Sequence, residues 1–181
     1  MGLLGRQQMV LLAVAGVVAA AFVGAALGQS GSQAAIERGK YLVETSGCHD
    51  CHTPYKNGQP DMTRVLIGHP QEIKIAAPAK LPAPWNMAGS ETNTAWLGPW
   101  GVSFSTNLTP DRKTGIGLWS EQVFMDTIRK GKHGGTGRDI LPPMPWPGYA
   151  KFVDGDLKAI YAFLRSIPAV VNQVPQPLPP K

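Results

Sequence analysis

Two cysteines and a histidine near residue 50 constrain this chain more than any other feature of its sequence. They occur as Cys48-His49-Asp50-Cys51-His52, with the spacing C-x-x-C-H. Two thiols at this spacing can each form a thioether with one vinyl group of a single porphyrin, and the adjacent imidazole can then bind the iron. The pattern therefore predicts one covalently attached haem c, with Cys48 and Cys51 as attachment sites and His52 as an iron ligand.

Similar cysteine spacings also occur in zinc sites and in redox-active dithiols or structural disulfides. Zinc needs four ligands, but Cys48 and Cys51 are the only cysteines, so two histidines would have to complete a site. A thioredoxin-like dithiol is expected between a strand and a helix. Here a helical segment precedes the motif and a proline-rich loop follows it. Both alternatives stay open, and haem attachment is the favoured interpretation.

An uncharged, apolar segment near the N-terminus predicts export from the cytoplasm. It covers residues 9–28 and follows Arg6. The basic start and the small residues of Ala26-Leu27-Gly28 are typical of a cleaved signal peptide. The segment also just reaches the length that an uncleaved helix needs to span a bilayer. Both alternatives place the rest of the chain in the periplasm, where bacterial haem c is attached, either soluble or tethered to the cytoplasmic membrane. Membrane contact is expected only through residues 9–28, if they are retained.

The pattern of the whole chain predicts a single haem domain with short appendages. We expect four segments: a signal peptide or membrane anchor over 1–28, a linker over 29–33, the haem domain over 34–168, and a proline-rich tail over 169–181 that is extended or disordered.

Within the domain, the sequence predicts an all-α fold with long irregular loops. Apolar residues at helical spacing predict helices over 34–46, 121–131 and 155–166. Ser120 and Asp154 are the expected N-caps of the second and third helices. Prolines and glycines predict long loops over 53–106 and 132–150. We expect the first loop to wrap over one edge of the haem, anchored by apolar residues that include Trp85, Trp96 and Phe104.

A haem bound by His52 has a second axial position, for which several sulfur and imidazole side chains compete. The candidates are Met62, Met87, Met125, Met144, His49, His69 and His133. Met144 lies among the prolines of Pro142-Pro143-Met144-Pro145, which stiffen the backbone and lower the entropy cost of holding a thioether at the iron. We expect Met144 to be the ligand, with His133 as the next candidate. His/Met ligation favours a relatively high potential and electron transfer.

These motifs together resemble a class I c-type cytochrome. More narrowly, the chain is similar to the haem domains of the cytochrome c subunits that serve membrane-bound alcohol, aldehyde and gluconate dehydrogenases. The resemblance covers residues 35–168 and rests on Arg38-Gly39-Lys40-Tyr41-Leu42, the haem motif, Thr106-Asn107-Leu108-Thr109-Pro110-Asp111 with Thr114-Gly115-Ile116-Gly117, Leu141-Pro142-Pro143-Met144-Pro145-Trp146, and Asp156-Leu157-Lys158-Ala159-Ile160-Tyr161. The dehydrogenase subunits carry three haem domains, whereas this chain has one C-x-x-C-H motif.

The resemblance implies a class I cytochrome c fold, with three to five helices around one haem c. It also implies thioethers at Cys48 and Cys51, iron ligation by His52 and Met144, and a crossing of the first and last helices at Gly39 and Tyr161. The expected function is electron transfer between a periplasmic dehydrogenase and the respiratory chain, with an oxidase or another cytochrome as acceptor. The alternative is a haem enzyme or sensor whose sixth ligand is displaceable.

The distribution of basic and acidic residues indicates which kinds of partner the chain can bind. The chain carries 17 basic and 12 acidic residues, and its basic residues are not interleaved with aromatics as in nucleic-acid-binding modules. We therefore expect no nucleic acid. Arg129, Lys130, Lys132 and Arg138 precede the Met144 loop and form either a solvated helix end or a basic rim that steers an acidic redox partner. By position alone, Asn107, Trp119 and Arg138 are candidates to bind the haem propionates.

Overall fold

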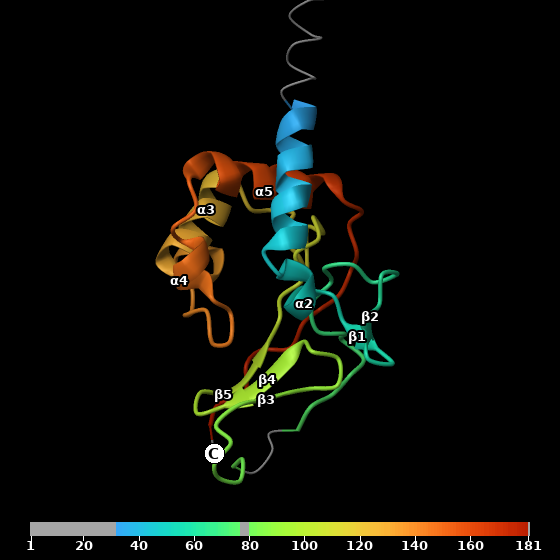
Figure 1. The fold of residues 1–181 in the computed structure, drawn as a ribbon, viewed down its shortest axis with the longest axis vertical. Coiled ribbons are helices and arrows are strands. Elements are labelled where there is room, and N and C mark those ends of the chain that lie inside the picture. The colour runs from blue at the N-terminus through green and yellow to red at the C-terminus, as the bar shows by residue number, and fades with distance from the viewer. Residues whose placement is uncertain (1–31, 77–79, 181) are drawn as a thin grey trace, which may run out of the picture.

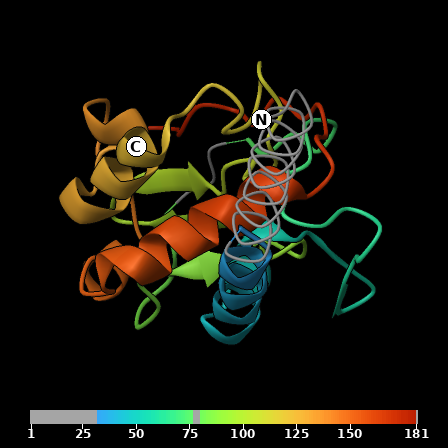
Figure 2. The same ribbon diagram turned by 90° about the horizontal axis from the view of Figure 1, so that it is seen from above.

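The computed structural model describes residues 32–76 and 80–180, and Figures 1 and 2 show their arrangement. The predicted signal peptide or anchor over 1–28 lies outside the described residues. Among the residues that are described, no helix is both long and apolar enough to cross a membrane.

The helices follow the order expected from the sequence. A helix over residues 32–45, called here the N-terminal helix, precedes α2 (Cys48–His52), α3 (Glu121–Lys130), the 3-10 turn η1 (His133–Gly135), α4 (Trp146–Tyr149) and α5 (Asp154–Ser166). Ser120 caps α3 as predicted, because its hydroxyl accepts a hydrogen bond from the Val123 N–H at 3.2 Å. Asp154 does not cap α5: it is the first helical residue, and its carboxylate pairs with Arg129 instead.

The all-α class is not confirmed, because two small antiparallel sheets lie within the segment expected to be irregular. One pairs β1 (Tyr55–Lys56) with β2 (Gln59–Pro60), and the other has the order β3 (Ala88–Gly89), β4 (Ala95–Gly98), β5 (Gly101–Phe104). Trp96 lies opposite Ser103, and Gly98 lies opposite Gly101 across a Pro99-Trp100 turn. The apolar residues at 95–97 and at 102 and 104 form stretches too short to distinguish a strand from a loop in a segment with so many prolines. Helices with small sheets remain compatible with a cytochrome c-like fold.

The N-terminal helix and α5 cross at Gly39, as the resemblance implied (Figure 2). A Cβ atom at Gly39 would overlap the carbonyl oxygen of Ala159 and lie 2.8 Å from the Cβ of Phe163, both on α5. Only glycine permits so close an approach of two backbones. Tyr161 has another role, because its hydroxyl donates to the Trp119 carbonyl at 2.7 Å.

The apolar residues form two separate cores. The larger unites the N-terminal helix, α3 and α5, and its buried members include Val43, Phe124, Leu157 and Leu164. The smaller one contains Ala95, Val102 and Phe104 of the three-stranded sheet, with Leu178 packed against it. Trp85, an expected apolar anchor of the loop, is instead 69% exposed.

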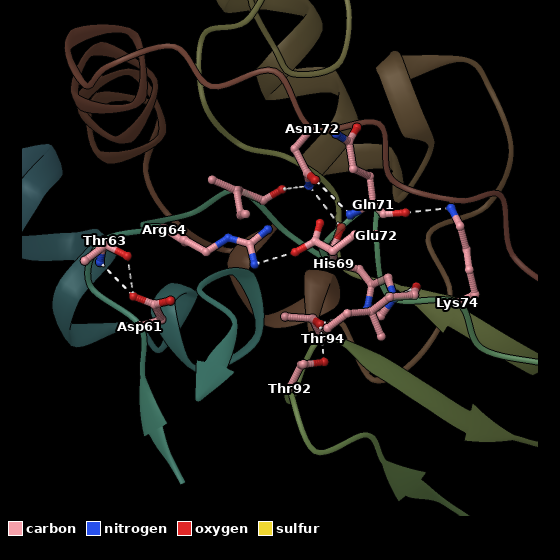
Figure 3. Close-up of polar contacts among 12 residues, drawn as sticks. Asp61, Thr63, Arg64, His69, Gln71, Glu72, Lys74, Thr92, Thr94 and Asn172 are labelled. Atoms are coloured by element: carbon pink, nitrogen blue, oxygen red, sulfur yellow. Dashed lines mark hydrogen bonds and ion pairs between the residues drawn. The ribbon is translucent and has the colours of Figure 1, made fainter. Parts of the chain in front are cut away.

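The C-terminal segment is extended and hydrogen-bonded to the domain rather than disordered. It runs from α5 back to the three-stranded sheet, where Val102 and Leu178 exchange two backbone hydrogen bonds of 2.9 Å (Figure 1). Midway, the buried Asn172 side chain donates to the carbonyls of Ile67 and His69 and accepts from the Gln71 N–H (Figure 3). The tail thus fastens the loop after α2 to the sheet.

Candidate functional site: a cofactor cavity around the C-x-x-C-H motif

One cavity brings together all four residues predicted to bind the cofactor. Cys48, Cys51 and His52 line it from α2, and Met144 lines it from the loop before α4. These two segments are far apart in the sequence, so their meeting is a result of the fold. The four side chains are two thiols, an imidazole and a thioether, which is the donor set expected for a c-type haem with His/Met ligation.

The cavity is mostly apolar. Its space amounts to about 1270 Å³ when the part that opens to solvent is included. Side chains from the N-terminal helix, α3, α5, β5 and the tail form much of its wall: Val43, Phe104, Phe124, Ile128, Leu157, Ile160, Leu164 and Pro177. This apolar lining suits a porphyrin, whose faces are apolar.

Several hydrogen bonds fix the motif at the cavity. Before α2, the Tyr149 hydroxyl donates to the Ser46 carbonyl at 2.6 Å. After α2, the Gly68 N–H donates to the His52 carbonyl at 2.8 Å. Gly68 has φ +74°, and a Cβ there would overlap the Ser105 carbonyl oxygen, so glycine is required for this approach. The chain on both sides of the motif is therefore held in place by distant segments.

His52 is buried, and its orientation is set by the chain. Its Nδ1 N–H donates to the Thr106 carbonyl at 2.8 Å, which leaves Nε2 with the free lone pair. A backbone acceptor at one ring nitrogen is the usual way to fix a metal-binding histidine as the required tautomer. Burial lowers the pKa of His52, the Thr106 bond opposes that shift, and the neutral imidazole can act as a ligand.

The cysteines are free thiols in the structure, not a disulfide. Burial raises the pKa of Cys48 to about 11 and also raises the pKa of Cys51. Both are therefore protonated at neutral pH. Among the described residues, no group of three or more His, Cys, Asp or Glu side chains is placed to hold a metal ion such as zinc. His69 is buried elsewhere, with its ring nitrogens bonded to the Thr94 hydroxyl at 2.9 Å and the Ile73 carbonyl at 3.0 Å (Figure 3).

The structure narrows the choice of a sixth ligand. Met144 and His133 both line the cavity, whereas the other candidates do not: Met62, Met87, Met125, His49 and His69. Met62 is 63% exposed, and Met125 is buried in the helical core. The Met144 loop is tied at two points before the methionine, because the Ile140 N–H donates to the Gly131 carbonyl and the Ser103 hydroxyl donates to the Pro142 carbonyl at 2.5 Å.

Two of the three residues proposed by position for the propionates, Trp119 and Arg138, line the cavity. Asn107 does not line it. Its side chain instead donates to the Val170 carbonyl at 2.8 Å and so anchors the tail.

Trp96 was expected only as an apolar anchor, yet it lines the cavity from β4 and its Nε1 is buried without a hydrogen-bond partner among the described residues. An unsatisfied buried donor costs about 1–3 kcal/mol. No sequence signal identified this donor, because its position depends on the sheet.

The basic rim is largely neutralised within the chain. Arg129 pairs with Asp154, Lys130 with Asp126, and Lys132 with Asp139. Arg138 differs, since no described carboxylate lies within ion-pairing distance of it.

Comparisons with known proteins agree with the chemistry of the cavity. No protein-family model matches the chain. It is similar to the cytochrome c subunit of the quinone alcohol dehydrogenase of Gluconobacter oxydans, with 34% identity over 160 residues, which is 87% of this chain and 26% of the relative. The cytochrome c subunit of gluconate 2-dehydrogenase from Pantoea cypripedii is 33% identical over 144 residues, which is 78% of this chain and 25% of the relative. The fructose dehydrogenase cytochrome subunit of Gluconobacter japonicus is 27% identical over 154 residues, which is 82% of this chain and 26% of the relative. The chain therefore spans about a quarter of the length of these relatives.

Proposed function

We propose that this chain, similar over most of its length to cytochrome c subunits of dehydrogenases, is an electron-transfer protein with one covalently attached haem c. Cys48 and Cys51 would hold the haem by thioethers, and His52 and Met144 would be its axial ligands. The observation that carries the proposal is the convergence of these four side chains on one apolar cavity. When bound, haem supplies one-electron exchange between Fe(III) and Fe(II).

The protein's own residues hold the proposed ligands in fixed positions. Thr106 fixes the tautomer of His52, and the Met144 loop is held by Gly131 and Ser103. The apolar wall excludes water, which favours electron transfer over reaction with small molecules. In this proposal the chain is an electron-transfer subunit or carrier and not a catalytic subunit.

The relatives are named as subunits of dehydrogenases, which supports a dehydrogenase as electron donor. We further propose that the chain works in the periplasm, either soluble or tethered to the cytoplasmic membrane through residues 1–28. There it would pass electrons to a cytochrome or an oxidase of the respiratory chain. Cell fractionation followed by N-terminal sequencing tests this location. Recovery of unprocessed protein in the cytoplasm would contradict it.

A haem stain of the denatured protein and a redox-resolved absorption spectrum test the cofactor and its ligands. The wild-type protein should keep the stain after denaturation and show a low-spin ferrous spectrum with a weak far-red sulfur-to-iron band in the ferric state. Met144→Ala should lose that band, whereas Met62→Ala, which removes an exposed methionine outside the cavity, should retain it.

Each outcome separates the proposal from its rivals. A stain that is lost on denaturation would contradict covalent attachment. A far-red band that survives in Met144→Ala would contradict Met144 as ligand. Rapid binding of carbon monoxide by the wild-type ferrous protein would favour an enzyme or sensor with a displaceable sixth ligand. A low-spin spectrum that persists in Met144→Ala but is lost in Met144→Ala/His133→Ala would identify His133 as a substitute ligand.

A further inference from the structure

The segment that carries Met144 has few groups by which the rest of the protein can hold it. Three of the five residues over 141–145 are prolines, which have no backbone N–H, so the segment is held mainly through its carbonyl oxygens. Among the described residues, one hydrogen bond reaches residues 141–144, from the Ser103 hydroxyl to the Pro142 carbonyl at 2.5 Å (Figure 1). The position of Met144 therefore depends on a contact from β5, 39 positions earlier in the chain.

The surroundings of Ser103 direct its hydroxyl proton to Pro142. The Ser103 side chain is buried, and the Trp100 Nε1–H donates to its oxygen at 3.3 Å. A hydroxyl has one proton and two lone pairs, so this bond occupies a lone pair and leaves the proton for an acceptor. The Pro142 carbonyl at 2.5 Å is much nearer than the other acceptor, the Trp96 carbonyl at 3.5 Å.

Trp100 is itself held where its N–H reaches Ser103. It follows Pro99 in the turn between β4 and β5, and its ring lies against Gly98, where a Cβ would overlap the ring. The absence of a side chain at Gly98 therefore lets the indole lie against the strand. Two hydrogen bonds in series, from Trp100 to Ser103 and from Ser103 to the Pro142 carbonyl, connect the turn of the sheet with the methionine loop.

We propose that Ser103 is a positioning residue that keeps Met144 at the iron and that Trp100 acts through Ser103, an inference that rests on the proposed function. With the hydrogen bond made, the carbonyl two residues before Met144 is fixed, and the thioether loses little further freedom when it binds. Without this bond, the segment is freer, Met144 leaves the sixth position more often, and small ligands can enter. These two side chains of the sheet therefore determine whether the site excludes added ligands, as an electron carrier needs, or admits them.

A titration of the ferric protein with imidazole, followed by loss of the far-red sulfur-to-iron band, measures how often Met144 leaves. Imidazole binds only where the sixth position is free, so its apparent affinity rises in proportion to the fraction of protein in that state. Ser103→Ala should raise the affinity about tenfold, which is the effect of losing one typical hydrogen bond. Trp100→Phe removes only the N–H that orients the hydroxyl and should raise it about twofold to threefold.

Three control variants separate positioning from general loosening of the structure. Trp85→Phe changes an exposed indole, and Ser166→Ala removes an exposed hydroxyl on α5. Asn172→Ala removes buried hydrogen bonds of the tail without a bond to the methionine loop. All three should bind imidazole with wild-type affinity. Because Trp100 acts through Ser103, the double variant Ser103→Ala/Trp100→Phe should match Ser103→Ala alone.

The outcomes distinguish this inference from the proposed function. If the wild-type protein has the far-red band and Ser103→Ala binds imidazole no more tightly than Ser166→Ala, the positioning role is refuted and the proposed function stands. An equal rise in Asn172→Ala would also refute it, because loosening alone would then explain the effect. If the wild-type protein lacks the haem stain, the proposed function itself fails. Should Ser103→Ala not fold, Trp100→Phe decides in the same titration: a raised affinity supports the inference, and an unchanged affinity refutes it.

Discussion

The helical region and the sheet region of this protein are held together by different interactions. The helical region (the N-terminal helix, α2, α3 and α5) is fixed by the packing of apolar side chains around the cavity and by the close crossing at Gly39. The sheet region (β3–β5, the loop over 68–76 and the tail over 168–180) has a small apolar core around Ala95, Val102 and Phe104 and relies on hydrogen bonds to its neighbours. Packing governs one region and polar pairing the other.

Because of this difference, we expect the two regions to be sensitive to different substitutions. A helix crossing has no tolerance for added volume, because close-packed interiors cannot absorb a misplaced methyl group. A hydrogen-bonded loop tolerates changes in size, but it loses stability when buried polar groups are left without partners. The comparison would be contradicted if added volume at the helix crossing had little effect on stability, or if the loss of a buried polar partner in the loop had little effect.

The largest effect is expected from Gly39→Ala. The new methyl group would overlap the Ala159 carbonyl oxygen, so the two helices must separate. We expect a loss of more than about 3 kcal/mol in the free energy of unfolding, larger than the gain of about 1 kcal/mol in helix propensity. Urea denaturation followed by circular dichroism measures it. Gly155→Ala on α5 is the control, because nothing lies within 4 Å of its added Cβ, and it should not destabilise the protein.

An intermediate effect is expected from Asn172→Ala in the sheet region. The Asn172 side chain is 2% exposed and bonds two carbonyls and one N–H, which would lose these partners together. The expected loss is about 2 kcal/mol in the free energy of unfolding. The exposed neighbour Gln173→Ala should change it by less than about 0.5 kcal/mol. Equal stabilities of the two variants would show that polar pairing does not hold the tail.

The smallest effect concerns the turn that joins the two regions. In the folded protein, hydrogen bonds from the Thr114 hydroxyl (the larger effect) and from the Thr114 N–H lower the pKa of Asp111 below its usual 3.8. In the unfolded chain, Asp111 therefore binds its proton at a higher pH than in the folded protein. This contribution to stability is present above about pH 4 and is lost as the pH falls through the folded pKa. In Asp111→Asn, the urea midpoint of unfolding should fall less between pH 5 and pH 2 than in the wild type or in the control Glu91→Gln. A fall equal to that of the wild type would refute the contribution of Asp111 to stability.

Local sequence patterns predicted those features that depend on neighbouring residues. The periodicity at 155–166 located α5, and Ser120 capped α3 as expected, since both depend on residues a few positions apart. The three-stranded sheet was missed although its strands pair within residues 88–104, because its apolar stretches are short and lie among prolines. Its bridge to the tail, between Val102 and Leu178, joins residues 76 positions apart and has no local signal. Trp85 was misjudged because an aromatic side chain in a loop is buried only if another segment covers it.

The sequence by itself determined which chemistry we propose for the site. Two thiols and an imidazole at fixed spacing, with a methionine among prolines, indicate the proposed set of donor atoms without any knowledge of the fold. Only the tertiary structure decided which side chains share the cavity. It brought Met144 and His133 to the cavity and left the other candidates outside, and it placed Trp96 and Arg138 on the wall. The physical reason is that covalent spacing fixes local reactivity, whereas contacts between distant segments depend on how the whole chain buries its apolar surface.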